Sequence, residues 1–231
     1  DATEGWINTA ESTGQSGLLP AFIAATGGTI TTVCTDYKVH TFTGPGTLCV
    51  SCAGNVLGSS TVDYLVVAGG GGATQGGGGA GGYRESSGVA SGSYTASPLG
   101  ACVSALPVSV TGYPIDVGAG GVGVNTVTAG TGIASTFSTI TSAGGGFGAA
   151  ACGTGGDHTG GSGGSGGGAG SVGDPCAAAG AGNTPTVSPP QGNSGGALAP
   201  TPAQAPYYGG SGGGGASAAG GVQSPTGSPA G

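Results

Sequence analysis

Of the 231 residues, 60 are glycine and 14 are proline, and only 5% are charged, whereas ordinary globular chains carry about 7% glycine and about 25% charged residues. Two basic residues against nine acidic ones leave a formal net charge of −7, which argues against nucleic-acid binding because too few cations are available for the phosphates. No apolar run is long enough for membrane insertion, and 36% hydrophobic residues with a mean hydropathy of +0.19 oppose disorder along the whole chain.

Residues 1–28 are polar and mixed, with Trp6 and one short apolar run at residues 18–23 (LLPAFI). We expect an N-terminal arm that packs against a neighbouring subunit or domain. Because the chain starts with Asp1 and lacks the apolar core of a signal peptide, we expect a processed chain or a segment of a longer one.

The next part, residues 29–142, is predicted to be an all-β domain. Residues 29–35 (TITTVCT) and 37–43 (YKVHTFT) are rich in Thr, Val, Tyr and Phe, the residues that favour strands. Gly and Pro turns separate further predicted strands at residues 47–51, 62–68, 104–111, 114–117, 122–128 and 133–141. Short strands without an amphipathic helix predict a β-sandwich with interleaved glycine-rich loops.

The last part, residues 143–231, consists largely of Gly, Ala, Ser, Thr and Pro. Glycine loses the most backbone entropy on ordering, so ordered tracts must gain backbone contacts in return. The Gly-Gly-Ser spacing of residues 160–165 fits an extended helix with three residues per turn. We therefore expect a C-terminal sheaf of polyglycine II-like helices that hydrogen-bond to one another.

The six cysteines are candidates for disulfide bonds in an oxidising, extracellular setting. The Cys49–Cys52 pair has metal-ligand spacing, but zinc would need a second pair of cysteines or histidines. Free buried thiols and a metal site remain the alternatives, and the pairing is open. The candidates are Cys34, Cys49, Cys52, Cys102, Cys152 and Cys176.

Other motifs give little support for catalysis or for a cofactor. Residues 118–123 (GAGGVG) match a dinucleotide-binding pattern, but no helix pattern or suitably spaced acid follows, so we interpret them as a turn. His40 lies in a predicted strand and His158 in a glycine loop, without positioned partners for a catalytic triad. We interpret Asp157 and Asp174 as solvated acids in loops rather than as ligands of an ion. We expect neither an enzyme nor a bound metal or cofactor.

Tyr207 and Tyr208 are the candidate receptor-contact residues. They lie within Gly- and Pro-rich sequence that offers little core, and exposed aromatic side chains on rigid loops are typical contact anchors. The alternative is that they cap one end of the glycine-rich sheaf.

Three stretches resemble the glycine-rich domain of bacteriophage tail fibres, common in phages of aquatic bacteria such as cyanophages. They are residues 37–42 (YKVHTF), 61–72 (TVDYLVVAGGGG) and 76–85 (GGGGAGGYRE), and residues 96–107, 113–118 and 137–141 extend the match in the same order. The resemblance covers roughly residues 25–220. Cys152 and Cys176 depart from it, because plain glycine is expected there, and residues 1–24 match no known pattern.

The resemblance implies a virion protein of the tail fibre or adhesin, used in host attachment and assembled as a homotrimer or a higher assembly. Its partners would be its own copies, other virion proteins and a glycan or protein on the host surface. The alternative is a subunit of an extracellular filament or virion coat that binds only its own copies, which the scarcity of charge would favour.

Overall fold

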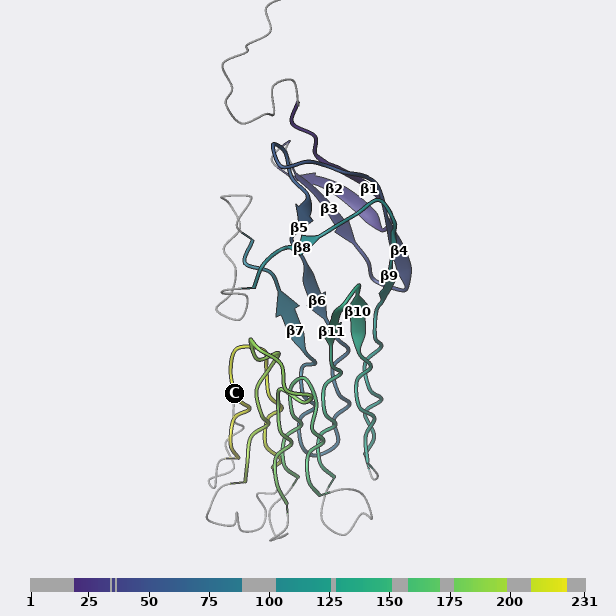
Figure 1. Ribbon diagram of the computed structural model, residues 1–231. Helices are drawn as coiled ribbons and strands as arrows, with labels where there is room; N and C mark the ends of the chain where they lie inside the picture. Colours follow the sequence, from purple (N-terminus) through teal and green to yellow (C-terminus); the bar gives the residue numbers. More distant parts are fainter. Residues whose placement is uncertain are drawn as a thin grey trace, which may run out of the picture.

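The computed structural model describes residues 19–33, 35, 37–88, 103–125, 128–150, 158–170, 177–198 and 209–223. This part of the chain is all-β and contains no helix. Figure 1 shows β strands at one end and a bundle of extended segments at the other. We call this bundle the glycine bundle; it comprises residues 68–82, 117–125, 128–134, 143–150, 158–170, 177–198 and 209–223.

The strands form one five-stranded sheet, in the order β1-β4-β9-β10-β11, and three two-stranded sheets, β2–β3, β5–β8 and β6–β7. All the pairs are antiparallel. In chain order the strands are β1 (Ile23–Thr26), β2 (Thr29–Val33), β3 (Tyr37–Thr41), β4 (Gly46–Ala53), β5 (Thr61–Val62), β6 (Leu65–Val67), β7 (Tyr83–Glu85), β8 (Leu106–Pro107), β9 (Gly112–Asp116), β10 (Ser135–Phe137) and β11 (Ile140–Ser142).

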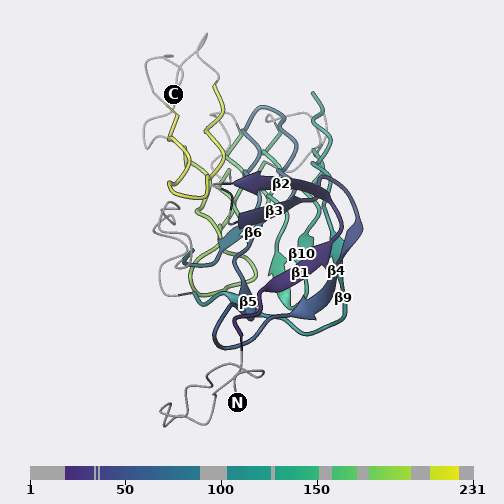
Figure 2. The same ribbon diagram turned by 90° about the horizontal axis from the view of Figure 1, so that it is seen from above.

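The hydrophobic core lies among these strands rather than in the glycine bundle. Burial alternates along β9, as expected for a strand with one face on the core. The rings of Tyr113 and Phe137 meet edge to face, with centroids 6.2 Å apart. The buried core side chains are Leu48, Val50, Val66, Val108, Phe137 and Ile140. Figure 2 looks down on the β2–β3 hairpin, which lies at the end of the molecule away from the bundle.

The strand predictions agree with this architecture in class but differ in detail. The five-stranded sheet begins at β1, ahead of the predicted domain boundary at residue 28, because Ile23 and Ala25 turn toward the core. The stretch 62–68 is divided between β5 and β6. A strand predicted at 122–128 is wrong over its described residues, 122–125 and 128, which form no ladder and lie in the glycine bundle.

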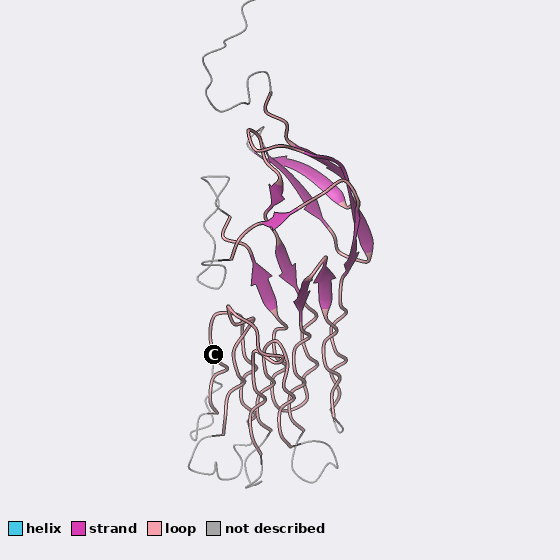
Figure 3. Cartoon of the chain, viewed as in Figure 1, coloured by secondary structure: helices cyan, strands magenta, loops and turns pink. Residues whose placement is uncertain are grey.

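The glycine tracts expected as loops between strands are instead part of the bundle. Residues 68–82 leave β6 and return to β7, and residues 117–134 connect β9 to β10. Both tracts run alongside the C-terminal segments (Figures 1 and 3), and Gly79 donates its N–H to the carbonyl of Gly146 at 2.9 Å. Glycine at the positions that face another segment permits this close approach. The bundle is therefore built from both predicted domains.

Candidate functional site

Backbone hydrogen bonds in the glycine bundle repeat every three residues. Within one segment, N–H groups three residues apart donate to carbonyls of the same neighbouring segment. Gly69 and Gly72 donate to residues 133 and 130, Gly76 and Gly79 to residues 149 and 146, and Gly77 and Ala80 to residues 211 and 214. Each segment thus meets different neighbours on different sides, a pattern that a β-ladder does not have.

These bonds arrange the segments in three rows. The outer row runs through residues 117–124, 68–74, 76–82, 209–215 and 218–223. The middle row runs through residues 128–134, 143–150, 165–170 and 191–198, and the third through residues 158–162 and 177–182. Residues 165–170 bond to segments of all three rows and are buried throughout.

Interior glycines of the bundle leave no room for a side chain. A Cβ at Gly146 would lie 1.8 Å from the carbonyl oxygen of Gly161, and one at Gly167 would lie 1.8 Å from that of Phe147. On the outer side of the outer row the situation differs, because a Cβ at Gly120 would meet its nearest atom at 3.6 Å. Backbone contact therefore requires glycine at the inward positions, whereas nothing in the described chain requires it at Gly120.

A few buried polar side chains lie where the bundle meets the sheets. Gln191 is 1% exposed; its Oε1 accepts the N–H of Ala143 at 2.8 Å, and its Nε2 donates to the carbonyl of Pro185 at 2.8 Å. Ser142 Oγ donates to the carbonyl of Val66 at 2.7 Å. Each satisfies backbone groups where the three-residue pattern ends.

Charged groups gather near β6 and β7. Ser86 Oγ donates to Asp63 Oδ1 at 2.6 Å, and Tyr83 donates its hydroxyl to Glu85 Oε2 at 2.7 Å. Burial raises the pKa of the Tyr64 hydroxyl, and the positive charge of Arg84 opposes this rise. The cavity beside them holds about 10 Å³, the room of one water molecule. This cluster therefore stabilises the fold rather than enclosing a substrate.

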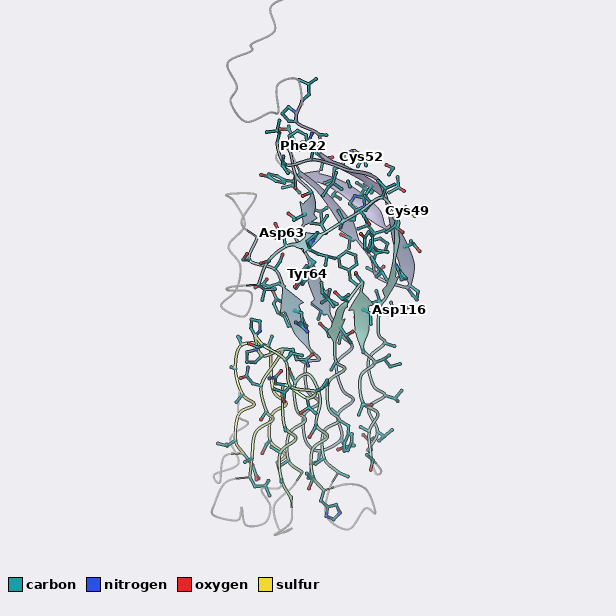
Figure 4. The ribbon with its side chains drawn as sticks, viewed as in Figure 1. Phe22, Cys49, Cys52, Asp63, Tyr64 and Asp116 are labelled. Carbon is teal, nitrogen blue, oxygen red and sulfur yellow. The ribbon has the colours of Figure 1, made fainter. Side chains whose placement is uncertain are left out.

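Only two of the predicted site residues lie in the described part of the chain. Cys49 and Cys52, both on β4, have exposed free thiols (Figure 4). Disulfide pairing stays a prediction, since four cysteines and both candidate receptor tyrosines lie outside the described residues: Cys34, Cys102, Cys152, Cys176, Tyr207 and Tyr208.

The remaining motifs of the sequence have structural surroundings. Residues 118–123 are not a turn but an extended segment of the outer row, where Gly121 donates to the carbonyl of Gly70 at 2.8 Å. His40 Nδ1 lies 2.8 Å from the carbonyl oxygen of Gly27. The described residues bring no three His, Cys, Asp or Glu side chains into a metal-binding group. Nor does this part of the chain contain an apolar helix of bilayer-spanning length.

Sequence reasoning does not find the polar side chains that close the bundle. Gln191 and Ser165 lie in tracts whose composition suggests solvent-exposed loops, yet both are buried. A glutamine directly after two prolines, inside a tract otherwise made of small residues, is the one available signal for Gln191.

The fold and the bundle define a glycine-rich, all-β structural class, in which glycine serves close backbone packing. The family model of the glycine-rich domain matches residues 43–231, and the chain therefore belongs to this family. No curated protein and no solved structure matches the chain.

Proposed function

We propose that the chain is a non-enzymatic structural protein, a module of a phage tail fibre or adhesin that attaches the virion to its host. The observation that carries the proposal is the three-residue hydrogen-bond period of the glycine bundle. Neighbours on several sides hold each segment, so the bundle would act as a stiff support. Such a support suits a protein that must present loops at a distance from a particle.

The period also supports the assignment of the bundle segments as polyglycine II helices. That helix has three residues per turn and no internal hydrogen bonds, so its backbone groups point outward to its neighbours. The core side chains come from both the five-stranded sheet and β6, which supports a β-sandwich as the platform above the bundle.

Receptor contact would take place at the end of the bundle away from the sheets. The described segments that flank residues 151–157, 171–176 and 199–208 end there (Figure 1). Tyr207 and Tyr208 belong to the last of these stretches, and we assign to them contact with a host glycan or protein. The arm would hold other virion proteins, and disulfides would fit an extracellular setting.

Labelling of native particles tests this role. Antibodies against the purified chain, followed by electron microscopy, are expected to mark a few sites at the tail tip. The purified chain is also expected to bind host cells and to slow phage adsorption, and Tyr207→Ala with Tyr208→Ala should remove both effects. The proposal would be overturned if the antibodies do not label the tail and the purified chain does not bind host cells.

The rival proposal is a filament or coat subunit that binds only its own copies. It is favoured by the composition of the described bundle, which contains no Asp, Glu, Lys or Arg, so copies would pack without charge repulsion. A helical lattice or shell of label in the same micrographs would establish this alternative. In either case the chain would assemble with its own copies, a homotrimer being the state implied by the tail-fibre resemblance.

A further inference from the structure

The outer row of the glycine bundle presents one broad face built mostly from glycine and alanine, and its segments also carry the exposed side chains of Val122 and Val222. We call it the open face; its outward positions include Gly70, Ala73, Gly120, Gly209 and Gly215. The middle row covers the inner side of these segments, while no described residue forms a further row on the outer side.

Glycine at these outward positions is not required by the chain's own packing. The nearest atom to an added Cβ would lie 3.4 Å away at Gly70, 3.6 Å away at Gly120 and 3.5 Å away at Gly215. These distances are ordinary van der Waals contacts. Glycine nevertheless loses more backbone entropy on ordering than alanine does, which destabilises the ordered structure. Interior positions of the bundle carry glycine because another backbone approaches closely, and the same reason would apply here if a backbone approached from outside.

The same face carries unused hydrogen-bonding groups. The N–H groups of Gly70, Gly78 and Gly213 donate no hydrogen bond within the described part of the chain, although their neighbours in sequence do. The carbonyls of Gly78 and Gly213 accept none there. These groups stand on three adjacent segments, so a backbone with the same three-residue period would match them. A second glycine bundle has that period.

The lack of charge and the exposed apolar side chains near the open face are consistent with a second glycine bundle as its partner. Among the described residues of the bundle, the single titratable side chain is the imidazole of His158. On β6, which leads into the outer row, Leu65 is 55% and Val67 is 47% exposed. Apolar side chains that border an uncharged face of unpaired amides favour a protein partner over water.

We infer that the open face is an interface between two copies of this chain, packed face to face so that the two outer rows continue one lattice. A two-fold arrangement lets free N–H groups of each copy donate to free carbonyls of the other, with the same residues on both sides. The inference does not depend on host attachment; a two-fold interface pairs copies rather than closing a trimer, so it is separate from the homotrimer that the tail-fibre resemblance implies.

Sedimentation velocity of the full chain over a concentration series tests the inference. Wild-type chain is expected to associate, and Gly70→Ala with Gly120→Ala to raise the dissociation constant at least about tenfold, since each methyl group would enter a backbone contact. Gly44→Ala is the matched control, because a Cβ there has nothing within 4 Å and Gly44 lies in the β3–β4 turn.

Amide hydrogen exchange distinguishes this interface from any other. Protection of residues 68–79 and 209–215 is expected to rise with protein concentration in wild type and in Gly44→Ala, but not in the double variant. A cooperative unfolding transition in the double variant, with the melting temperature of wild-type chain at a concentration where both are monomeric, shows that it is folded. A chain that stays monomeric throughout, or that associates equally well with both alanines, overturns the inference while leaving host attachment untouched.

Discussion

Glycine residues of this protein fall into two kinds that composition cannot separate. At interior positions such as Gly146 and Gly167, an added Cβ would lie 1.8 Å from a carbonyl oxygen of another segment, whereas Gly120 and Gly44 have room for one. The difference follows from whether a residue faces another segment or the outside of the bundle. Substitution at single positions should therefore have effects that range from severe to negligible.

Alanine at an interior glycine is expected to destabilise the chain, and alanine at an outer one is not. Gly167→Ala places a methyl group 1.8 Å from the carbonyl oxygen of Phe147, and backbone cannot yield as a side chain can. The expected loss in unfolding free energy is about 1–3 kcal/mol or more. Thermal unfolding measures it, with Gly44→Ala as the control, because a Cβ there has nothing within 4 Å; equal melting temperatures for the two variants would contradict the packing described above.

Stability at high pH should depend on Tyr64. Burial raises the pKa of its hydroxyl in the folded chain above the ordinary value of 10.0, so folding favours the neutral form. This contribution is complete below the unfolded pKa and is lost as the pH rises through the folded pKa. Tyr64→Phe should therefore reduce the loss of stability above about pH 10, as measured by denaturant unfolding.

Tyr113 supplies a control of opposite sign. Hydrogen bonds from Ser109, the side chain's first and the backbone N–H second, lower the pKa of its hydroxyl, so folding favours the ionised form. Tyr113→Phe should make the loss of stability at high pH steeper or leave it unchanged. If both substitutions change the pH dependence of the unfolding free energy in the same direction, burial does not explain the effect of Tyr64 on stability.

At the scale of elements, short strands and extended segments are joined by a small number of buried polar side chains. The segment from residue 143 follows β11 directly, and its first N–H bonds to Gln191 rather than to another backbone. The side chain of Gln191 also bonds to Pro185, and Asn183 Oδ1 accepts the Gln191 N–H at 3.2 Å. This one residue therefore holds the 183–191 turn against the start of the middle row.

Gln191→Leu is expected to lower the unfolding free energy by about 1–3 kcal/mol, because the partly buried N–H of Ala143 would lose the acceptor that the buried Gln191 side chain supplies. Chemical denaturation measures the change. Ser162→Ala is a suitable control, since Ser162 Oγ accepts a 3.3 Å bond from Ala181 at an exposed position and should alter stability little. Equal effects of the two substitutions would rule out a sealing role for Gln191.

On the scale of the whole molecule, the two predicted domains depend on each other. Residues 76–82 precede β7, yet the bonds that their N–H groups make within the bundle go to residues after 142. Strands β6 and β7 are thus anchored to a bundle that is completed only by the C-terminal half of the chain. The sheets and the bundle should fold as one unit.

A chain ending at Ser142 should fail to protect the amides of residues 76–82 from hydrogen exchange. Those of Gly76, Gly79 and Gly82 lose their acceptors, which are Ala149, Gly146 and Ala143. Exchange measured by mass spectrometry on the full and shortened chains checks this. Full protection in the shortened chain would mean that the β part folds independently of the bundle.

Much of the β part could be predicted from local sequence, because β-branched and aromatic residues cluster there. The stretches 29–35 and 37–43 form β2 and β3 with small changes at their ends. Local sequence does not predict β1 and β7, since IAAT and YRE carry little strand signal by themselves. Both strands exist because they pair with β4 and β6, which is a tertiary property.

The amino-acid sequence by itself determined the all-β class, the scarcity of charge and the use of glycine as a packing residue, because these follow from composition and local pattern. Only the tertiary structure decided which tracts lie side by side, that residues 68–82 and 117–134 join the C-terminal segments, and which glycines face inward. Glycine has no side chain to mark a face or a partner. Hydrogen bonds between residues far apart in the chain therefore determine which segments lie side by side and which glycines face inward.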